Sequence, residues 1–296
     1  MKSQNKAYLF AISAILLWST IASAFKITLQ FMSFVEVLFY SSFISTSVLW
    51  LLIVYQKKTI LFYRIAWKDI MNAAFRGFLN PFLYYLVLLK AYTLLKAQEA
   101  GTLNYIWPIT LVLLSIPLLK QKIGFISILA ILISFSGILF ISTEGNLSEL
   151  AFREPLGVFL ALVSSIFWAL YWILNVKDKK DELLKLFLNF GFGTIFIFIY
   201  MIFFQEMKLP SIEGLLGSAY IGLFEMSLTY FFWLMALKFS ENTAKVSNLV
   251  YISPFISLII IERVLGEKIL ISTIVGLTLI VAGILIQHFT GSRKKR

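Results

Sequence analysis

The chain has 296 residues, of which 60% are hydrophobic and only 14% are charged, and its net charge at pH 7 is +11. A water-soluble core of that length could not bury so much apolar surface, so the composition indicates an integral membrane protein. Lys and Arg gather at the ends of apolar runs instead of forming a basic stripe, which argues against nucleic acid as a partner. The chain has no cysteine, which excludes disulfides and thiolate chemistry.

Apolar runs long enough to cross a membrane follow one another along the whole chain. A helix needs about 20 apolar residues to cross a hydrocarbon layer about 30 Å thick. The runs are continuous and not alternating, which favours helices over a β-barrel. We therefore expect an all-α integral membrane protein with ten transmembrane helices, near residues 7–27, 34–55, 70–90, 97–119, 123–142, 155–176, 184–205, 213–237, 244–262 and 269–289.

The positions of Lys and Arg predict the orientation of the chain. With a cytoplasmic N-terminus, eighteen of these residues lie on the cytoplasmic side and six lie in external loops. The positive-inside rule therefore predicts a multi-pass protein of the inner (cytoplasmic) membrane with both termini in the cytoplasm. The first run also resembles a cleavable signal peptide, but residues 11–18 (AISAILLW) match residues 161–168 (ALVSSIFW), where no signal peptidase would act.

Two further pairs of segments repeat at one offset. LNYIWP at 103–108 corresponds to LVYISP at 249–254, and GIL at 137–139 corresponds to GIL at 283–285, in both cases 146 residues later. Repeated segments in the same order indicate that the chain contains two copies of one unit.

The two copies define two halves. We expect a first five-helix repeat at 1–145 and a second at 151–296, around a central cavity. Because five is an odd number, the second copy enters the membrane from the opposite side, so the repeats are inverted. Inverted repeats provide two related arrangements that open a central site to either side, which favours a transporter working by alternating access.

Other classes of membrane protein share such a duplication. A channel, a scaffold, a lipid flippase or a membrane enzyme could be built on the same repeat, because a fold alone does not define a function. No enzyme motif is present: His288 is the only histidine, so no histidine pair can hold a metal, and no G-x-x-x-x-G-K-[ST] segment binds nucleotide phosphates. We expect no catalysis and no cofactor.

Aromatic residues near the middles of the spans form a candidate site. Trp and Tyr usually lie at the membrane surface, but Trp18, Trp107 and Tyr251 lie near span centres. Buried indole N–H and phenol O–H groups need partners, which indicates a polar or water-filled interior. The sixth span carries an aromatic stripe on one helix face, although such a stripe is also typical of plain helix packing, at Trp168, Tyr171, Trp172 and Asn175.

Two prolines interrupt the helical hydrogen bonding near these rings. Pro108 and Pro254 leave the carbonyls of Asn104 and Val250 without their helical partners. Such a carbonyl needs water, a side chain or a substrate at this depth, and the side chain of Asn104 could serve. The prolines could equally act only as kinks.

Glu225 is the most deeply placed charged residue, about 16 Å along the eighth span at 1.5 Å per residue. An intramembrane carboxylate indicates a functional site, here a proton carrier or a contact for a substrate amine. The structural alternatives are a hydrogen bond to a neighbouring helix and an ion pair with Arg76.

The chain resembles a known family over essentially its whole length, and three segments carry the resemblance. WST at 18–20, AQEAGTLNYIWP at 97–108 and IFWALY at 166–171 resemble the EamA-type branch of the drug/metabolite transporter superfamily. The run at 97–108 is similar to bacterial aromatic amino acid exporters. The resemblance implies a basket of helices around a central cavity, faced or bordered by Trp18, Asn104, Tyr105, Trp107 and Trp168.

We therefore expect an exporter of small metabolites, namely amino acids or related amines. Glu225 departs from the pattern of the aromatic exporters and favours a cationic or zwitterionic solute. The expected partners are the lipid bilayer, this solute and protons. The predicted substrate-binding residues are Trp18, Asn104, Tyr105, Trp107, Trp168, Tyr171, Trp172, Asn175, Glu225 and Tyr251.

Overall fold

The computed structural model describes residues 3–119, 124–146, 154–205, 209–240, 246 and 249–293. Within these residues all regular secondary structure is helical. Six helices are unbroken: α1 (Gln4–Thr28), α2 (Phe34–Tyr55), α7 (Phe125–Ser142), α8 (Pro155–Lys177), α9 (Glu182–Phe204) and α14 (Ile271–Arg293). A 3-10 turn, η1 (Thr59–Arg64), follows α2.

The other four predicted spans are broken in the middle, and the breaks correspond between the two halves. The third and eighth spans each contain a π-helical segment, and the fourth and ninth each break just before a proline. Their parts are α3 (Trp67–Gly77), η2 (Phe78–Leu83) and α4 (Tyr84–Leu94); α5 (Ala97–Asn104) and α6 (Trp107–Leu119); α10 (Ile212–Tyr220), η3 (Ile221–Leu228) and α11 (Thr229–Phe239); and η4 (Leu249–Ile252) and α13 (Ser253–Leu265).

Seven helical segments of the described chain are long and apolar enough to cross a membrane. They are α1, α2, the α5–α6 segment, α7, α8, α9 and the α10–α11 segment. The predicted spans near 70–90, 244–262 and 269–289 do not reach this standard. The span near 70–90 is divided into shorter helices and carries charges. In the span near 244–262, most of 244–248 lies outside the described residues. In the span near 269–289, only Ile271–Ile286 is counted, as a shorter apolar helix. The side chain of His288 also lies outside the described part. The count of ten therefore stays a prediction.

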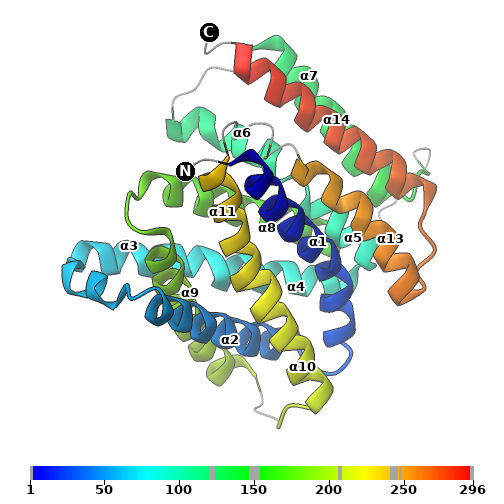
Figure 1. Ribbon diagram of the computed structural model, residues 1–296. Helices are drawn as coiled ribbons and strands as arrows, with labels where there is room; N and C mark the ends of the chain where they lie inside the picture. Colours follow the sequence, from blue (N-terminus) through cyan, green and yellow to red (C-terminus); the bar gives the residue numbers. More distant parts are fainter. Residues whose placement is uncertain are drawn as a thin grey trace.

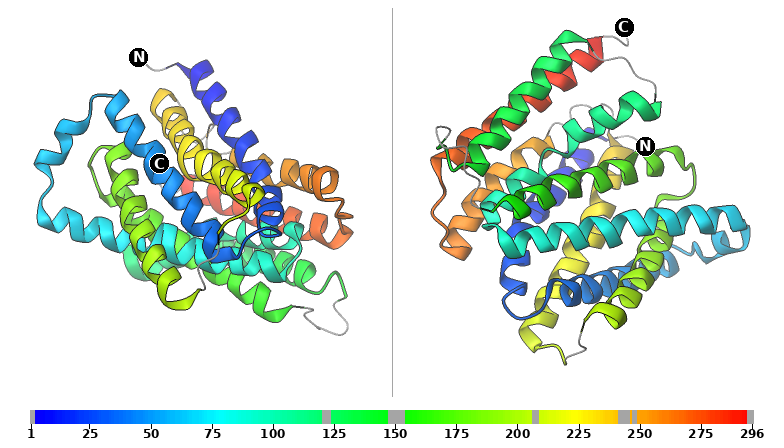
Figure 2. Two further views of the ribbon diagram at one scale, coloured as in Figure 1. Left: turned by 90° about the horizontal axis from the view of Figure 1, so that it is seen from below. Right: turned by 180° about the vertical axis from the view of Figure 1, so that it is seen from behind.

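The helices divide into a central group and two flanking groups (Figures 1 and 2). α2, α3 and α9 lie on one side, the pair α7–α14 lies on the other, and α1, α4, α8, α11 and α13 lie between them. α7 and α14 approach closely because glycines meet at their interface. A Cβ atom on Gly137 would lie 2.5 Å from the carbonyl oxygen of Gly276. Small residues allow this backbone contact between membrane helices.

Candidate functional site

A cavity of about 550 Å³ lies between the central helices. Side chains from α1, α4, α5, α6, α8, η3, α11 and α13 line it. Small-molecule sites in proteins have volumes of about 300–1,000 Å³, so the cavity suits one solute of metabolite size. Eight of the ten predicted site residues line it: Trp18, Asn104, Tyr105, Trp107, Trp168, Trp172, Glu225 and Tyr251.

The other two predicted residues, Tyr171 and Asn175, do not line the cavity. Both are buried on α8, and Tyr171 accepts a hydrogen bond from Asn189 Nδ2 of α9 at 3.3 Å. The Tyr171 ring also packs against Trp172, with ring centroids 5.9 Å apart. The four residues of the predicted stripe therefore face two different neighbours. Trp168 and Trp172 line the cavity, whereas Tyr171 contacts α9. Tyr171 supports the cavity wall from behind.

Glu225 is a buried carboxylate with one oxygen bonded and one free. Tyr85 donates a hydrogen bond to Glu225 Oε1 at 2.8 Å, whereas Oε2 has no hydrogen-bond partner among the described residues. The side chain is only 7% exposed and lines the cavity. Of the two structural alternatives, the hydrogen bond to a neighbouring helix is present, from Tyr85 of α4, and the ion pair with Arg76 is absent, because Arg76 pairs with Asp178 at 2.8 Å. Oε2 is itself buried in the cavity wall, so a side-chain movement would have to expose it before a ligand could donate a hydrogen bond to it.

The π-helical segment η3 holds Glu225 in place through contacts with α2. Ser45 Oγ donates to the carbonyl of Met226 at 2.8 Å, and Ser227 Oγ donates to the carbonyl of Gly222 at 2.7 Å. A Cβ atom on Gly222 would lie 2.5 Å from the carbonyl oxygen of Ser41, so only glycine allows this approach. These bonds tie the π-helical segment to α2 and to itself.

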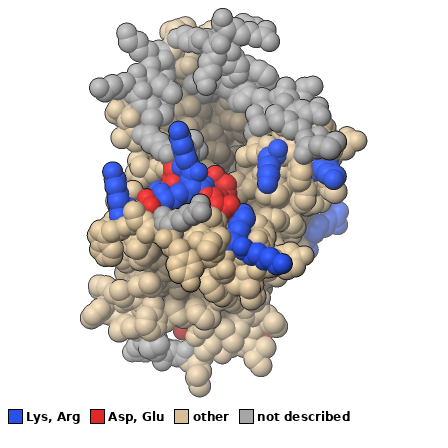
Figure 3. Space-filling model, turned by 60° about the vertical axis from the view of Figure 1, so that its left-hand side comes forward, with Lys and Arg blue, Asp and Glu red and all other residues tan. Residues whose placement is uncertain are grey.

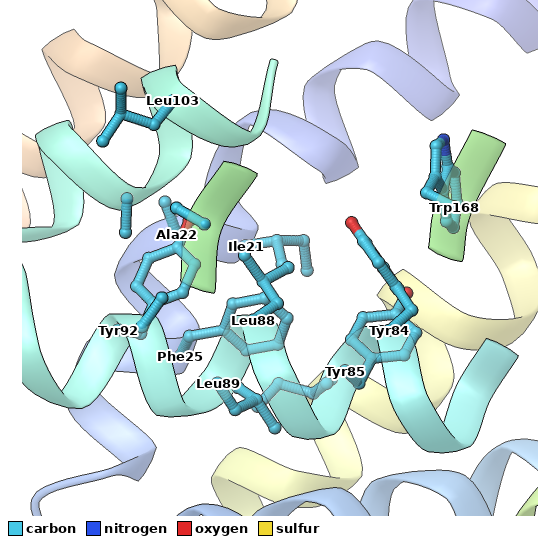
Figure 4. Packing of buried hydrophobic residues seen from close by; sticks show 14 of the residues in the cluster. Ile21, Ala22, Phe25, Tyr84, Tyr85, Leu88, Leu89, Tyr92, Leu103 and Trp168 are labelled. Atoms are coloured by element: carbon cyan, nitrogen blue, oxygen red, sulfur yellow. The ribbon is translucent and has the colours of Figure 1, made fainter. Parts of the chain in front are cut away.

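Aromatic rings form a continuous surface between Glu225 and the far side of the cavity. Tyr84 lies 4.6 Å from Tyr85 and 4.7 Å from Trp168, measured between ring centroids. Figure 4 shows Tyr84 and Tyr85 next to each other on one helix, with Trp168 on a separate segment above them. The indole Nε1 of Trp168 is buried and has no hydrogen-bond partner in the described structure. The cavity therefore has aromatic walls, in which one unpaired acceptor and one unpaired donor are buried.

One of the two proline breaks is repaired, by a side chain other than that of Asn104. The Asn104 side chain is already bonded, donating to Ser164 Oγ at 2.9 Å and accepting from the Tyr84 hydroxyl at 3.1 Å. The carbonyl of Val250, released by Pro254, instead accepts from the Tyr105 hydroxyl at 2.5 Å. A side chain of the first half thus repairs the backbone of the second half.

Gln98 and Glu267 join α5 to the segment between α13 and α14. The Glu267 carboxylate accepts from the amides of Ala97 and Gln98, at 3.0 and 3.3 Å, where it also matches the positive end of α5. Gln98 Nε2 donates to the carbonyl of Lys268 at 2.9 Å, and Gln98 Oε1 accepts from the amide of Leu270 at 3.0 Å. Gln98 lines the cavity, so these bonds close part of its wall. Neither side chain stands out in the sequence, where the two lie far apart.

A charged cluster joins α3 to the loop between α8 and α9. Besides the Arg76–Asp178 pair, Lys180 pairs with Asp69 at 2.6 Å. Figure 3 shows acidic and basic side chains gathered in one patch on the side where α3 lies in Figure 1. Burial opposes ionisation of Asp178, but the Lys180 amide and the charges of Arg76 and Lys180 hold the pKa of Asp178 below its usual range.

These features define a multi-span membrane protein with an internal solute-sized cavity. The chain belongs to the EamA-like transporter family, whose model matches residues 5–143 and 155–287. The family-level resemblance is thereby confirmed, while the aromatic amino acid exporter branch stays a prediction. Members of this family are transporters and are generally not enzymes.

The relatives with this similarity are themselves uncharacterized transporters. One from Clostridium kluyveri is 27% identical over 242 residues, covering 78% of this chain and 76% of the relative. One from Archaeoglobus fulgidus is 22% identical over 275 residues, covering 91% and 94%. The Bacillus subtilis transporter YvbV is 24% identical over 226 residues, covering 73% and 71%. A solved crystal structure shares the fold, with a TM-score of 0.67 at 19% identity over 99% of this chain and 100% of that one.

Proposed function

We propose that this protein exports amino acids or related amines across the cytoplasmic membrane, and that the solute binds in the central cavity. The observation that carries the proposal is the unpaired carboxylate oxygen of Glu225 in the wall of an aromatic cavity. Among the lining residues that the structure describes, Glu225 is the only charged side chain.

A solute ammonium would match this site in two ways. It would neutralise a buried carboxylate, which is costly to leave unpaired. The surrounding rings, Tyr84, Trp168 and Trp107 among them, would add cation–π and stacking contacts. Trp168 Nε1 would donate to an acceptor on the solute, such as a carboxylate. Glu225 could instead carry a proton in exchange for the solute, and the variant described in the Discussion separates these roles.

Alternating access is supported by the arrangement of the two halves. We propose that residues 1–145 and 151–296 are inverted repeats with both termini in the cytoplasm. The two stretches matched by the family model, 5–143 and 155–287, follow these halves. The breaks in the third and fourth spans also have counterparts in the eighth and ninth. Two half-structures that exchange conformations would open the cavity first to one side and then to the other.

Counterflow in proteoliposomes tests the proposal. With purified protein, we expect unlabelled tryptamine or tryptophan inside the vesicles to accelerate the uptake of the same labelled compound, with saturation. This trans-stimulation requires one site that faces each side in turn, so a channel or a scaffold would not show it. The tryptamine–tryptophan pair differs only by the carboxylate and therefore also measures what an acceptor adds to binding. Movement of head-labelled lipid without exchange of either indole would instead indicate a flippase.

A further inference from the structure

The repeated motif L-x-Y-I-x-P pairs a tyrosine with a released carbonyl in each half. The tyrosines, Tyr105 and Tyr251, stand three residues before their prolines. The carbonyls that the prolines leave without a helical bond belong to Asn104 and Val250, one residue before each tyrosine. Each half therefore carries one donor and one acceptor at matching positions.

In the structure the donor of one half serves the acceptor of the other half. The Tyr105 hydroxyl donates to the Val250 carbonyl at 2.5 Å. The corresponding hydroxyl of Tyr251 lines the same cavity and has no hydrogen-bond partner among the described residues. Of the two equivalent hydrogen bonds between the halves, the one from Tyr105 to Val250 is thus formed, and the one from Tyr251 to Asn104 is not.

The backbone conformation also differs between the two copies of the motif. In the first half α5 ends at Asn104 and α6 begins at Trp107. In the second half Leu249–Ile252 forms the 3-10 turn η4, which leads directly into α13. Similar sequences thus adopt two local conformations, which is expected if the halves of a transporter exchange conformations between its two states.

We propose that Tyr105 and Tyr251 form a reciprocal switch for the proposed transport cycle. In the state seen here Tyr105 donates to the carbonyl of Val250, and in the opposite state Tyr251 donates to the carbonyl of Asn104. This inference rests on the proposed function, because it requires that the cavity opens alternately to the two sides. It assigns the motif's tyrosines a role in selecting the state, in addition to their place in the cavity wall.

The switch has a physical advantage over two permanent bonds. Each of these carbonyls lacks its α-helical partner, so a transition that broke one tyrosine bond without forming the other would cost about one hydrogen bond. Two equal bonds that replace each other keep the energies of the two states similar. The side chain of Asn104 cannot take over this role, because Tyr84 and Ser164 already occupy it.

The test measures which end of the cavity is open in Tyr105→Phe, Tyr251→Phe and the double variant. The chain has no cysteine, so Ser257→Cys on α13 and Leu111→Cys on α6 each give a single cavity reporter. The two positions are 146 residues apart and equivalent in the repeat, so the proposed inverted repeats place them toward opposite ends of the cavity. In nanodiscs a water-soluble maleimide reaches both faces of the membrane. The ratio of the alkylation rate of Ser257→Cys to that of Leu111→Cys therefore reports which end of the cavity is open. We expect the two single variants to shift this ratio in opposite directions by about fivefold, the factor that corresponds to one ordinary hydrogen bond. The double variant should return close to the wild-type ratio.

A permanent brace gives a different result, which would overturn the switch. If Tyr105 bonds Val250 in both states, Tyr251→Phe leaves the ratio unchanged and the double variant behaves as Tyr105→Phe does. Tyr251→Phe alone decides the question if Tyr105→Phe does not fold, because Tyr251 has no hydrogen bond to lose in the state seen here. Counterflow in the same preparations separates the two proposals. Exchange without opposite shifts overturns only the switch, and opposite shifts without exchange overturn only the proposed export of these solutes.

Discussion

Replacing Glu225 by Gln is expected to raise the half-saturating concentration of tryptamine in counterflow by about 100-fold or more. Gln keeps the size of the side chain and can still accept the bond from Tyr85, but it removes the charge that would pair with the ammonium. Losing one partner of a buried ion pair costs about 3–5 kcal/mol. The neutral analogue 3-methylindole lacks the ammonium, so its binding, measured by tryptophan fluorescence, should change little.

Glu213→Gln is the matched control for this variant. It makes the same chemical change in the same predicted span, but Glu213 is exposed at the start of α10 and outside the cavity lining. We expect wild-type exchange from it. Retained exchange with loss of pH-driven uptake in Glu225→Gln would show that Glu225 carries protons and does not bind the amine. Wild-type behaviour in both assays would remove Glu225 from the site.

Replacing Asp178 by Asn is expected to destabilise the protein by about 3 kcal/mol, measured as unfolding in detergent at pH 7. Asp178 and Arg76 have side chains that are only 9% and 7% exposed, so the substitution leaves a buried guanidinium without its carboxylate. Asp181→Asn is the control, because the Lys58–Asp181 pair is 32% and 27% exposed. An exposed pair contributes about 1 kcal/mol or less.

The effect of Asp178→Asn should depend on pH. Since the pKa of Asp178 is lower in the folded protein than in the unfolded chain, its ionised form stabilises the fold at neutral pH. That stabilisation is complete above about pH 4, the ordinary aspartate range, and is lost as the pH falls further. The stability gap between wild type and Asp178→Asn should therefore narrow below about pH 4. A gap that stays constant down to pH 3 would contradict the assignment of this pair.

Residue type and depth in the spans predicted eight of the residues that line the cavity, but they missed other aromatic lining residues such as Tyr84, Tyr92 and Trp233. Trp18, Trp107 and Tyr251 stand near span centres, where an indole or phenol has little reason to be unless polar groups are near. The prolines likewise marked the positions where the fourth and ninth spans break. The π-helical segment at Glu225 had no such signal, because it contains no proline and depends on Ser45 of a neighbouring helix.

Contacts between the two halves could not be predicted in the same way. Periodicity showed that Tyr171 shares a helix face with Trp168, but it could not show that Tyr171 meets α9 and not the cavity. Gln98 and Glu267 are far apart in sequence and belong to no charge pattern, so only the packing of the two halves brings them together. The partner of Arg76 was missed for the same reason.

Protection of a cavity cysteine by solute tests most directly whether this cavity is the transport site. In Ser257→Cys, saturating tryptamine should slow alkylation by a water-soluble maleimide, because the bound solute would occupy the space beside α13. The same concentration should give no protection when Glu225→Gln is added. Alkylation that proceeds at the same rate with and without tryptamine, in a preparation that exchanges tryptamine, would place the transport site elsewhere and contradict the account.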